Sequence, residues 1–457
     1  MSKENYELNR HRVGGILNLY DVPAESLAFL KGNVYYPEFD SDTNYDPLKC
    51  EPSFRFLFGV EYKEISAFFV VKTGDFYFLL ARPDPELFFF SMPFTEEEAI
   101  NKWGAKGIVY EDELEAKLKE LKPPQILIME GIDTNSQKPV SPYSHPIFKK
   151  EEFASLIDRK KLFPAINDAR NIRTEEEIKY MAKACEMSSL GHKEAMKKIK
   201  VGQFEFNLAA LFQSQCYEMD YWAYPPICGA GKNASYLHYE LNDQQIKNGD
   251  LILCDMGAAY KGLCADITCT FPANGKFSNW QEKVYNVVLS AQVKAVAKLK
   301  PNIHYGDIQT ETYKDLLKGL VEIGLMKGDV EEMYAKLVHK VWMPHRLGHY
   351  IGYRVHDVGQ RSNEEGKEYK FIELSNLVFG QCLTIEPGIY FIDMLLNDAK
   401  KNDQISNYFI WDKITEAQNE VGGVRIEDTL YITQSGFENL TNVPRTVKEI
   451  EDWMASK

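Results

Sequence analysis

The sequence has no long apolar run and too few basic residues to offset its acidic ones. No apolar run approaches the roughly 20 residues that a membrane-spanning helix needs, and the polar N-terminus MSKENY leads into no apolar signal segment. The formal net charge of −14 argues against non-specific nucleic-acid binding, which needs a basic face. We therefore expect a protein that binds neither membranes nor nucleic acid.

Clustered cysteines are also missing. The eight cysteines are scattered over a long chain, and none forms a C-x-x-C pair. Disulfide frameworks belong to small, cysteine-dense secreted domains, and this chain is neither small nor cysteine-dense. We expect reduced, mostly buried thiols and a cytoplasmic location.

The composition is that of a folded protein, and its length predicts more than one core. Hydrophobic residues make up 44% of the chain, which disordered chains do not reach. A chain of 457 residues is expected to divide into two domains, here placed at 1–165 and 166–457. The first domain is predicted to be α/β from its alternating signals. These are β-prone runs at 54–59, 66–71 and 75–80, helical stretches at 96–103 and about 111–121, and a buried strand at 125–129.

The second domain opens with a helix-start signal. Thr174 can cap a helix while Glu177, three residues later, reaches back to complete a capping box. The pattern after it alternates pairs of helices with strands, which indicates an α/β (α+β) domain and resembles a duplicated unit, although the sequence contains no residue-level repeat. We expect helices at about 205–219, 279–299 and 307–323, strands across 227–271, a β-rich stretch at 354–433 and, within it, a polar surface loop at 397–413.

Two apolar, β-prone runs on either side of Lys261–Gly262 each carry an aspartate, Asp255 and Asp266. A two-residue turn there would place Asp255 opposite Thr268, with Asp266 as its diagonal neighbour on the same face. Diagonal neighbours lie roughly 7–8 Å apart at Cα, close enough for two carboxylates to share a metal site. A loop longer by one residue would reverse this parity, and both aspartates would also fit solvent-facing strand positions.

Histidines and glutamates that could complete a metal site follow later in the chain. His345, His349 and His356 fall within twelve residues, but the glutamate of H-E-x-x-H is missing, so a zincin site is excluded. Glu386 and Glu427 lie in β-prone segments, where either alone would be a surface charge. Four carboxylates and one imidazole suit a pair of divalent ions such as Mn²⁺, with Co²⁺, Fe²⁺ or Zn²⁺ also open. Two ions roughly 3.5–4 Å apart can hold a hydroxide between them and polarise a carbonyl.

The flanks of these residues resemble the creatinase/methionine-aminopeptidase superfamily and, within it, the eukaryotic prolidases (Xaa-Pro dipeptidases). The segments that carry the resemblance are DMGAAYKGLCADIT, MPHRLGHYIGYRVHD, LTIEPGIYFID and GGVRIEDT. The resemblance implies a "pita-bread" metallopeptidase domain at 166–457, a creatinase-like domain at 1–165 and a homodimer. It also implies two divalent metal ions, most often Mn²⁺, and a hydroxide held between them that hydrolyses Xaa-Pro dipeptides to release proline.

The resemblance further assigns roles to individual residues. For the metals, Asp255 would chelate one ion, His349 and Glu386 the other, and Asp266 and Glu427 would bridge them. For catalysis, Glu386 would move the proton, and His345 and His356 would orient the substrate and stabilise charge on the scissile carbonyl oxygen. For substrate binding, His238 and Tyr224 would line the pocket and Arg425 would stand near the substrate carboxylate.

Two departures from the prolidase pattern concern substrate choice. Arg346 stands where the family has glycine, and Ile372, fourteen residues before Glu386, stands where the family has an arginine for the dipeptide carboxylate. A gap in the alignment could place Arg361 or Lys370 there instead. One alternative is therefore an aminopeptidase P-like enzyme, which removes the residue before proline from longer peptides. Others are a non-catalytic binding member of the fold and a creatinase-type amidinohydrolase, which lacks the two-metal set.

Overall fold

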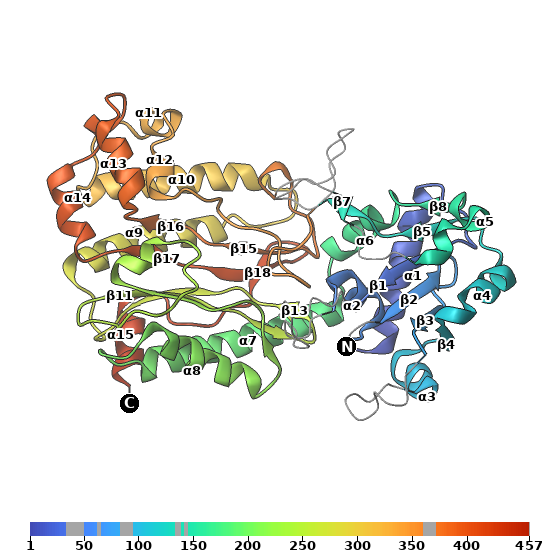
Figure 1. Cartoon of the computed structure of the whole chain (residues 1–457). Coiled ribbons are helices and arrows are strands. Elements are labelled where there is room, and N and C mark those ends of the chain that lie inside the picture. Colours follow the sequence, from blue (N-terminus) through green and yellow to red (C-terminus); the bar gives the residue numbers. More distant parts are fainter. Residues whose placement is uncertain are drawn as a thin grey trace. The chain divides into compact units, whose positions relative to one another are not determined.

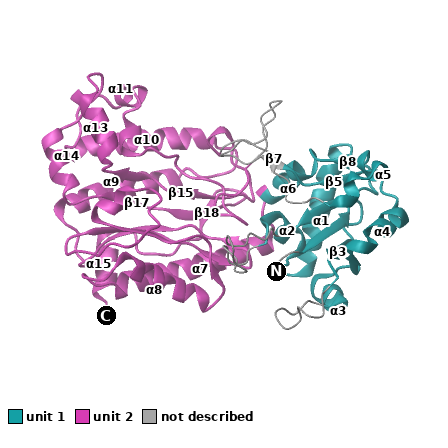
Figure 2. Cartoon of the chain, in the orientation of Figure 1, with its two compact units in different colours: residues 1–170, 361–368 teal, residues 171–360, 369–457 magenta. Residues whose placement is uncertain are grey.

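The computed structural model describes residues 1–32, 50–61, 65–82, 95–132, 139–140, 145–359 and 372–456. Arg361 and Lys370 therefore lie outside the described residues. The chain divides into two compact units, Met1–Arg170 and, after it, Asn171–Gln360 with Tyr369–Lys457 (Figure 2). Each unit has a hydrophobic core of its own.

The first unit is built on a six-stranded mixed sheet in the order β4-β3-β2-β1-β5-β8. Strand β1 pairs antiparallel with β2 and parallel with β5, and Phe29 stacks on Phe68 across the first of these pairs, with ring centroids 4.8 Å apart. The elements of this unit are α1 (Lys3–Leu19), β1 (Leu27–Lys31), α2 (Pro52–Phe58), β2 (Ser66–Val70), β3 (Phe76–Leu80), α3 (Glu96–Glu98), η2 (Ala99–Trp103), β4 (Ile108–Tyr110), η3 (Glu111–Glu113), α4 (Leu114–Leu121), β5 (Ile126–Ile128), β6 (Gly131–Ile132), β7 (Pro139–Val140), η4 (Pro146–Lys149), α5 (Glu151–Ala154), β8 (Ile157–Asp158) and α6 (Leu162–Asn171).

The strand expected at 54–59 is wrong, because this segment is helix α2. Its aromatic run favours a strand by composition, but its ends carry helix signals that outweigh this preference. Pro52 occupies the first turn, the side chain of Glu51 accepts a hydrogen bond from the Phe54 backbone N–H, and Gly59 ends the helix at φ +69°.

The second unit holds its strands between two pairs of helices, α7 and α8 on one side and α9 and α10 on the other (Figure 1). The expected capping box is confirmed, since the side chains of Thr174 and Glu177 each accept a hydrogen bond from the other's backbone N–H at the start of α7. The elements are α7 (Glu175–Lys198), α8 (Glu205–Tyr217), β9 (Tyr221–Trp222), β10 (Ile227–Ala230), η5 (Gly231–Ser235), β11 (Leu251–Asp255), β12 (Ala258–Tyr260), β13 (Leu263–Cys264), β14 (Thr268–Pro272), α9 (Asn279–Val296), α10 (Tyr305–Glu322), α11 (Val330–Ala335), α12 (His339–Trp342), η6 (Ile372–Leu374), β15 (Cys382–Ile385), β16 (Gly388–Tyr390), α13 (Asp393–Lys401), η7 (Ser406–Tyr408), α14 (Trp411–Gln418), β17 (Gly423–Arg425), β18 (Asp428–Ile432), β19 (Phe437–Asn439) and α15 (Val447–Ala455).

The polar loop expected at 397–413 is also wrong. The segment contains the end of α13, the turn η7 and the start of α14. Ile405, Tyr408 and Phe409 are buried in the core of the unit, so this insertion is anchored by packing although most of its residues are polar. The β-rich stretch expected from 354 to 433 is accordingly interrupted by two helices.

The hairpin that carries the two aspartates forms as expected. Tyr260 pairs with Leu263, so the turn is the two residues Lys261 and Gly262. Both have positive φ, 49° and 85°, as a type I′ hairpin turn requires. Asp255 lies opposite Thr268, which confirms the predicted register. None of the helices in the described part of the chain combines the length and apolar character that a bilayer crossing requires.

Candidate metal centre

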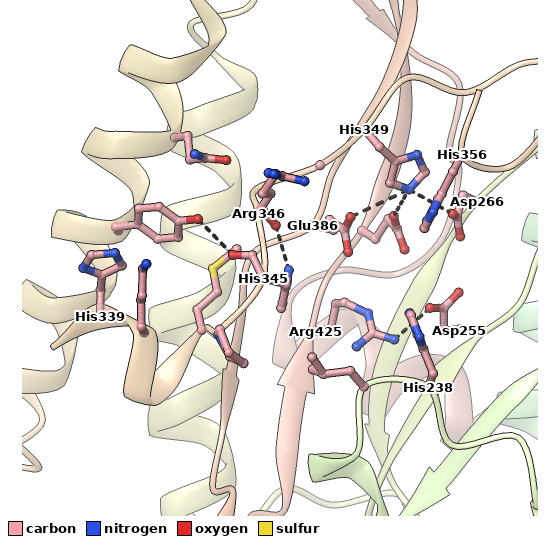
Figure 3. A pocket seen from close by; sticks show the side chains of 18 residues that line it. His238, Asp255, Asp266, His339, His345, Arg346, His349, His356, Glu386 and Arg425 are labelled. Carbon is pink, nitrogen blue, oxygen red and sulfur yellow. Dashed lines mark hydrogen bonds and ion pairs between the residues drawn. The ribbon is translucent and has the colours of Figure 1, made fainter. Parts of the chain in front are cut away.

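A cavity of about 630 Å³ opens in the second unit, and nine of the ten predicted site residues line it (Figure 3). Tyr224 is the predicted residue that is absent from its wall. The cavity has a carboxylate- and histidine-rich end and a second end formed by α10 and α12. Its described lining residues are Leu237, His238, Asp255, Asp266, Gln309, Tyr313, His339, Lys340, Met343, Pro344, His345, Arg346, Gly348, His349, His356, Glu386, Arg425 and Glu427.

Asp266, His349 and Glu427 bring their side chains to one point. Each offers a ligand atom, and these atoms all lie within 4.8 Å of one another. The His349 Nε2 atom lies 3.3 Å from Asp266 Oδ2, 3.7 Å from Glu386 Oε1 and 3.9 Å from Glu427 Oε1. The three carboxylates therefore surround a single imidazole nitrogen.

Backbone hydrogen bonds between strands and loops hold two of the carboxylates in place. Glu427 lies between β17 and β18, and its backbone N–H donates to the carbonyl of Thr268 on the neighbouring strand at 3.2 Å. Glu386 follows β15, and its N–H donates to Leu347 O at 2.8 Å, which ties it to the loop that carries His349. The site is thus assembled from segments that are far apart in the sequence, and backbone hydrogen bonds hold Glu386 and Glu427 in place.

One ring nitrogen of His349 is directed by the backbone. Its Nδ1 atom lies 3.1 Å from the carbonyl of Tyr350. A carbonyl only accepts, so this contact places the proton on Nδ1 and leaves the Nε2 lone pair facing the carboxylates. The backbone N–H of His349 donates to Thr384 Oγ1 at 3.2 Å, and this hydrogen bond holds the backbone that carries the ring.

These residues fit a divalent cation. Oε1 of Glu427 is buried and has no hydrogen-bond partner, an arrangement that is costly unless a cation binds there. Burial and the charges of neighbouring carboxylates raise the pKa values of Asp266 and Glu427 well above their usual range. Burial, with the charge of Glu427, raises the pKa of Glu386 to about 8. The donors are carboxylate oxygens and one imidazole, a set that suits hard or borderline divalent ions.

Asp255 differs from the other carboxylates because it has a cationic partner. Its Oδ2 atom lies 2.7 Å from Arg425 Nη2, and its Oδ1 lies 2.5 Å from the Tyr224 hydroxyl. Burial opposes its ionised form, but the charge of Arg425 and the hydrogen bonds from Tyr224 and Arg425 together lower the Asp255 pKa. The Tyr224 hydroxyl also lies 2.5 Å from Asp266 Oδ1, so it connects the two aspartates.

The other three predicted histidines lie around the carboxylates. His356 packs against His349 with ring centroids 4.2 Å apart, and the proximity of His349, with burial, lowers its pKa to about 4. Burial and Arg425 lower the pKa of His345 to about 3, and its Nε2 lies 2.9 Å from the Tyr390 hydroxyl. His238 is exposed at the rim close to Arg425 and Asp255 (Figure 3). At neutral pH, His345 and His356 are therefore uncharged.

Comparison with known proteins agrees with this geometry. Residues 179–434 match the model of metallopeptidase family M24. The Xaa-Pro dipeptidase of Homo sapiens is 34% identical, over 98% of this chain and 93% of its own. The chain belongs to metallopeptidase family M24. It is a hydrolase with the α/β pita-bread fold, and the predicted resemblance to the prolidases is confirmed.

Two other relatives of this M24 chain are aminopeptidases by name. A probable Xaa-Pro aminopeptidase of Coccidioides posadasii is 29% identical, over 98% of this chain and 96% of its own. The zinc-substituted aminopeptidase P of Escherichia coli, solved in complex with product, is 25% identical. That structure superposes with a TM-score of 0.81 and covers 100% of this chain and 99% of the other. The relatives of this chain therefore include both Xaa-Pro dipeptidases and aminopeptidases.

Sequence patterns missed several residues that support the M24 site. Tyr390 connects His345 and Arg425 through its hydroxyl. Arg445, far from any motif, donates from Nη1 to Thr268 O at 2.7 Å and from Nη2 to Asp428 Oδ1 at 2.5 Å. Tyr390 lies in the segment LTIEPGIYFID, but its role, like that of Arg445, depends on a contact that only the folded chain creates.

Proposed function

We propose that this M24 enzyme is an Xaa-Pro dipeptidase that uses two divalent metal ions, most readily Mn²⁺. The observation that carries the proposal is the convergence of Asp266, Glu386 and Glu427 on His349, beside Asp255, at one end of a cavity of about 630 Å³. A cavity of this size suits a small ligand. The 34% identity with the human Xaa-Pro dipeptidase supports the choice of substrate.

The proposed metal ligands are the five residues predicted from the sequence. Asp255 would hold one ion, His349 and Glu386 the other, and Asp266 and Glu427 would contact both. Two divalent ions supply, when bound, a water that ionises near neutral pH and a Lewis acid for the scissile carbonyl. They would also neutralise the negative charge that accumulates among these carboxylates.

The chain's own residues would move and stabilise charge around the peptide bond. Glu386 would take a proton from the attacking water and deliver it to the proline nitrogen as the bond breaks. His345 and His356, neutral at pH 7, would orient the substrate and stabilise charge on the scissile carbonyl oxygen, and His238 at the rim would line the pocket. The proline nitrogen of the scissile bond carries no hydrogen, so the pocket must recognise the proline ring by its shape.

An aminopeptidase P-like activity is the second candidate, and one observation favours it. Ile372 stands where the prolidase pattern has a carboxylate-binding arginine, and it is buried in the core of the unit. Arg425, the other cation expected near the substrate carboxylate, already pairs with Asp255. An enzyme without a carboxylate anchor would accept longer peptides.

The test is hydrolysis of Ala-Pro and Ala-Pro-Ala by chelated and Mn²⁺-reconstituted enzyme. We expect Mn²⁺-dependent cleavage of Ala-Pro, and its loss by at least about 10²-fold in Glu386→Gln. Glu416→Gln, an exposed residue of α14, is the control and should leave the activity unchanged. Cleavage of Ala-Pro-Ala alone would favour the aminopeptidase P-like activity. Absence of metal-dependent turnover of either peptide would contradict both.

A homodimer and a cytoplasmic location are part of the same proposal. All eight cysteines are free and buried, which supports a reducing compartment. Sedimentation of the metal-loaded enzyme would test the dimer.

A further inference from the structure

The loop that carries His349 lies along β15 as an irregular extra strand. Three backbone hydrogen bonds join the two segments: Ile351 N–H donates to Cys382 O at 3.1 Å, Thr384 N–H to His349 O at 2.9 Å and Glu386 N–H to Leu347 O at 2.8 Å. This is the spacing of an antiparallel pair in which His349 stands opposite Thr384 and Leu347 opposite Glu386. His349 and Glu386 are therefore diagonal neighbours, and the spacing between loop and strand sets the distance between their side chains.

The hydrogen bonding between this loop and β15 is only half complete. In a regular antiparallel pair of this kind, opposite residues exchange two hydrogen bonds, each N–H donating to the other's carbonyl. Here His349 and Thr384 make one of the two, because the N–H of His349 donates to the Thr384 hydroxyl oxygen, at 3.2 Å, and not to the Thr384 carbonyl. Two buried backbone groups, Leu347 N–H and Thr384 O, must then find partners outside the pair.

Helix α10 supplies both partners. Gln309 Oε1 accepts the hydrogen bond from Leu347 N–H at 3.0 Å, and the Tyr305 hydroxyl donates to Thr384 O at 3.2 Å. Tyr305 and Gln309 are four residues apart, so they lie on the same face of the helix. The two side chains thus take the place of the hydrogen bonds that would draw the loop fully onto β15.

Tyr313, four residues beyond Gln309, anchors the start of the same loop. Its hydroxyl donates to His345 O at 2.9 Å. Its ring stacks on the ring of His339, with centroids 4.5 Å apart, and His339 stacks on Tyr334 on its other side, at 4.9 Å. The stacked rings fix the direction of the Tyr313 hydroxyl, so α10 holds the loop at more than one point.

We infer that Tyr305 and Gln309 are positioning residues of the proposed metal site. By satisfying Leu347 N–H and Thr384 O from α10, they keep the loop at the spacing that leaves His349 Nε2 3.7 Å from Glu386 Oε1. Without them, the loop and β15 offer each other the missing partners, and the loop would move to complete the pairing. The inference rests on the proposed function, because it takes His349 and Glu386 as metal ligands.

The test measures Mn²⁺ binding to the chelated protein by calorimetry. Gln309→Met removes the acceptor but keeps the length of the side chain, and Tyr305→Phe removes the hydroxyl but keeps the ring. We expect each variant to bind Mn²⁺ about 10-fold more weakly, at the lower end of the effect of removing a residue that orients a metal ligand. In the loaded enzyme, kcat for Ala-Pro should fall by about 10-fold while KM changes by less than about 3-fold, because the displaced groups act on the chemical step.

Thr312→Val is the matched control. Thr312 belongs to the same helix, is 2% exposed and donates its hydroxyl to Ile308 O at 2.7 Å within α10. The variant loses a buried hydroxyl hydrogen bond, as Tyr305→Phe does, but this bond joins α10 only to itself. Its Mn²⁺ affinity and its kcat should stay within about 2-fold of the wild-type values.

Urea unfolding of each chelated variant checks that it is folded, and Tyr313→Phe replaces a variant that is not. The inference is overturned if the folded variants bind Mn²⁺ as tightly as the wild type, or if Thr312→Val weakens binding as much as they do. A rise in KM alone would also overturn it, because Gln309 would then act on the substrate. A wild type that neither binds Mn²⁺ nor cleaves proline peptides would instead overturn the proposed function.

Discussion

Arg425 and Asp255 form a buried ion pair, with Arg425 Nη2 2.7 Å from Asp255 Oδ2. The side chains are 4% and 13% exposed, so the pair is shielded from solvent. Asp255 keeps a low pKa because of it, whereas the neighbouring Asp266 has a raised one. The arginine thus holds one carboxylate of the site ionised and fixed before any cation arrives.

We predict that Arg425→Met weakens metal binding by about 10- to 100-fold, the usual effect of removing a residue that orients a metal ligand. The substitution leaves Asp255 without its cation and frees it to rotate. Mn²⁺ titration of the chelated protein by calorimetry measures the change. Arg425→Lys should restore only part of the affinity, since lysine cannot also reach Thr268 and Tyr390. Unchanged affinity in both variants would contradict a positioning role.

Tyr224→Phe removes the hydroxyl that lies 2.5 Å from both Asp255 and Asp266. In the chelated protein this removes a hydrogen-bonding group between two buried carboxyl groups, and we expect unfolding to become easier by about 1–3 kcal/mol. In the Mn²⁺-loaded protein the loss should be smaller, because bound cations would satisfy the same oxygens. Urea unfolding of both forms measures the difference.

Tyr285→Phe provides the comparison for that experiment. Its hydroxyl donates to Arg445 O at 2.7 Å, and the residue is 1% exposed. Arg445 O is not among the proposed ligands, so this variant should lose the same stability with and without Mn²⁺. Equal losses for Tyr224→Phe in the two forms would contradict the idea that Tyr224 substitutes for a cation.

The proposed ligand set could be suggested from the sequence because its five residues lie in segments that together resemble one family, although Glu386 or Glu427 alone carries no signal. The Lys261–Gly262 turn fixed the parity of Asp255 and Asp266 by local geometry alone. The elements that were mispredicted depend on other kinds of information. Helix α2 is decided by its end residues against the composition of its interior, and Phe409 is buried through tertiary packing that no local pattern reports. The partnership of Arg346 with Glu373 is likewise visible only in the fold.

Metal removal should make the stability of the protein depend on pH above about 6.5. In the chelated form Glu386 has a pKa of about 8, above its unfolded value near 4.5. A carboxyl group with a raised folded pKa stabilises the fold while it is protonated, and this contribution is lost as pH rises through the folded pKa. His345 and His356 have lowered pKa values, about 3 and 4, so they destabilise only below about 6.5, outside this window.

We therefore expect the free energy of unfolding of the chelated protein to fall between pH 6.5 and about 8. The carboxyl groups of Asp266 and Glu427 also have raised pKa values, so their ionisation lowers the stability in the same direction. Glu386→Gln should show a shallower fall, because glutamine does not titrate. The Mn²⁺-loaded wild type should show little change, since bound cations keep the carboxylates ionised throughout. Urea unfolding at several pH values measures all three, and a chelated protein that gains stability over this range would refute the assignment.

Gly348 lies where β15 packs against the loop that carries His349. A Cβ atom there would lie 2.1 Å from Thr384 O and 2.6 Å from the Tyr305 hydroxyl, both inside van der Waals contact. Gly348→Ala must therefore push the loop away from the strand that leads to Glu386. We expect a loss of about 1–3 kcal/mol in stability, as for other overpacked sites.

The effect of Gly348→Ala on catalysis should exceed its effect on folding. A displacement on the order of 1 Å at a reacting centre lowers rates by about 10²-fold. His349 adjoins the substituted residue, so kcat should fall by about that factor at a temperature where the variant is fully folded. Gly436→Ala is the matched control, since a Cβ atom there meets nothing within 4 Å. Near-wild-type kcat in Gly348→Ala would mean that catalysis tolerates a displacement of His349. Such tolerance would contradict the proposed role of His349 as a metal ligand.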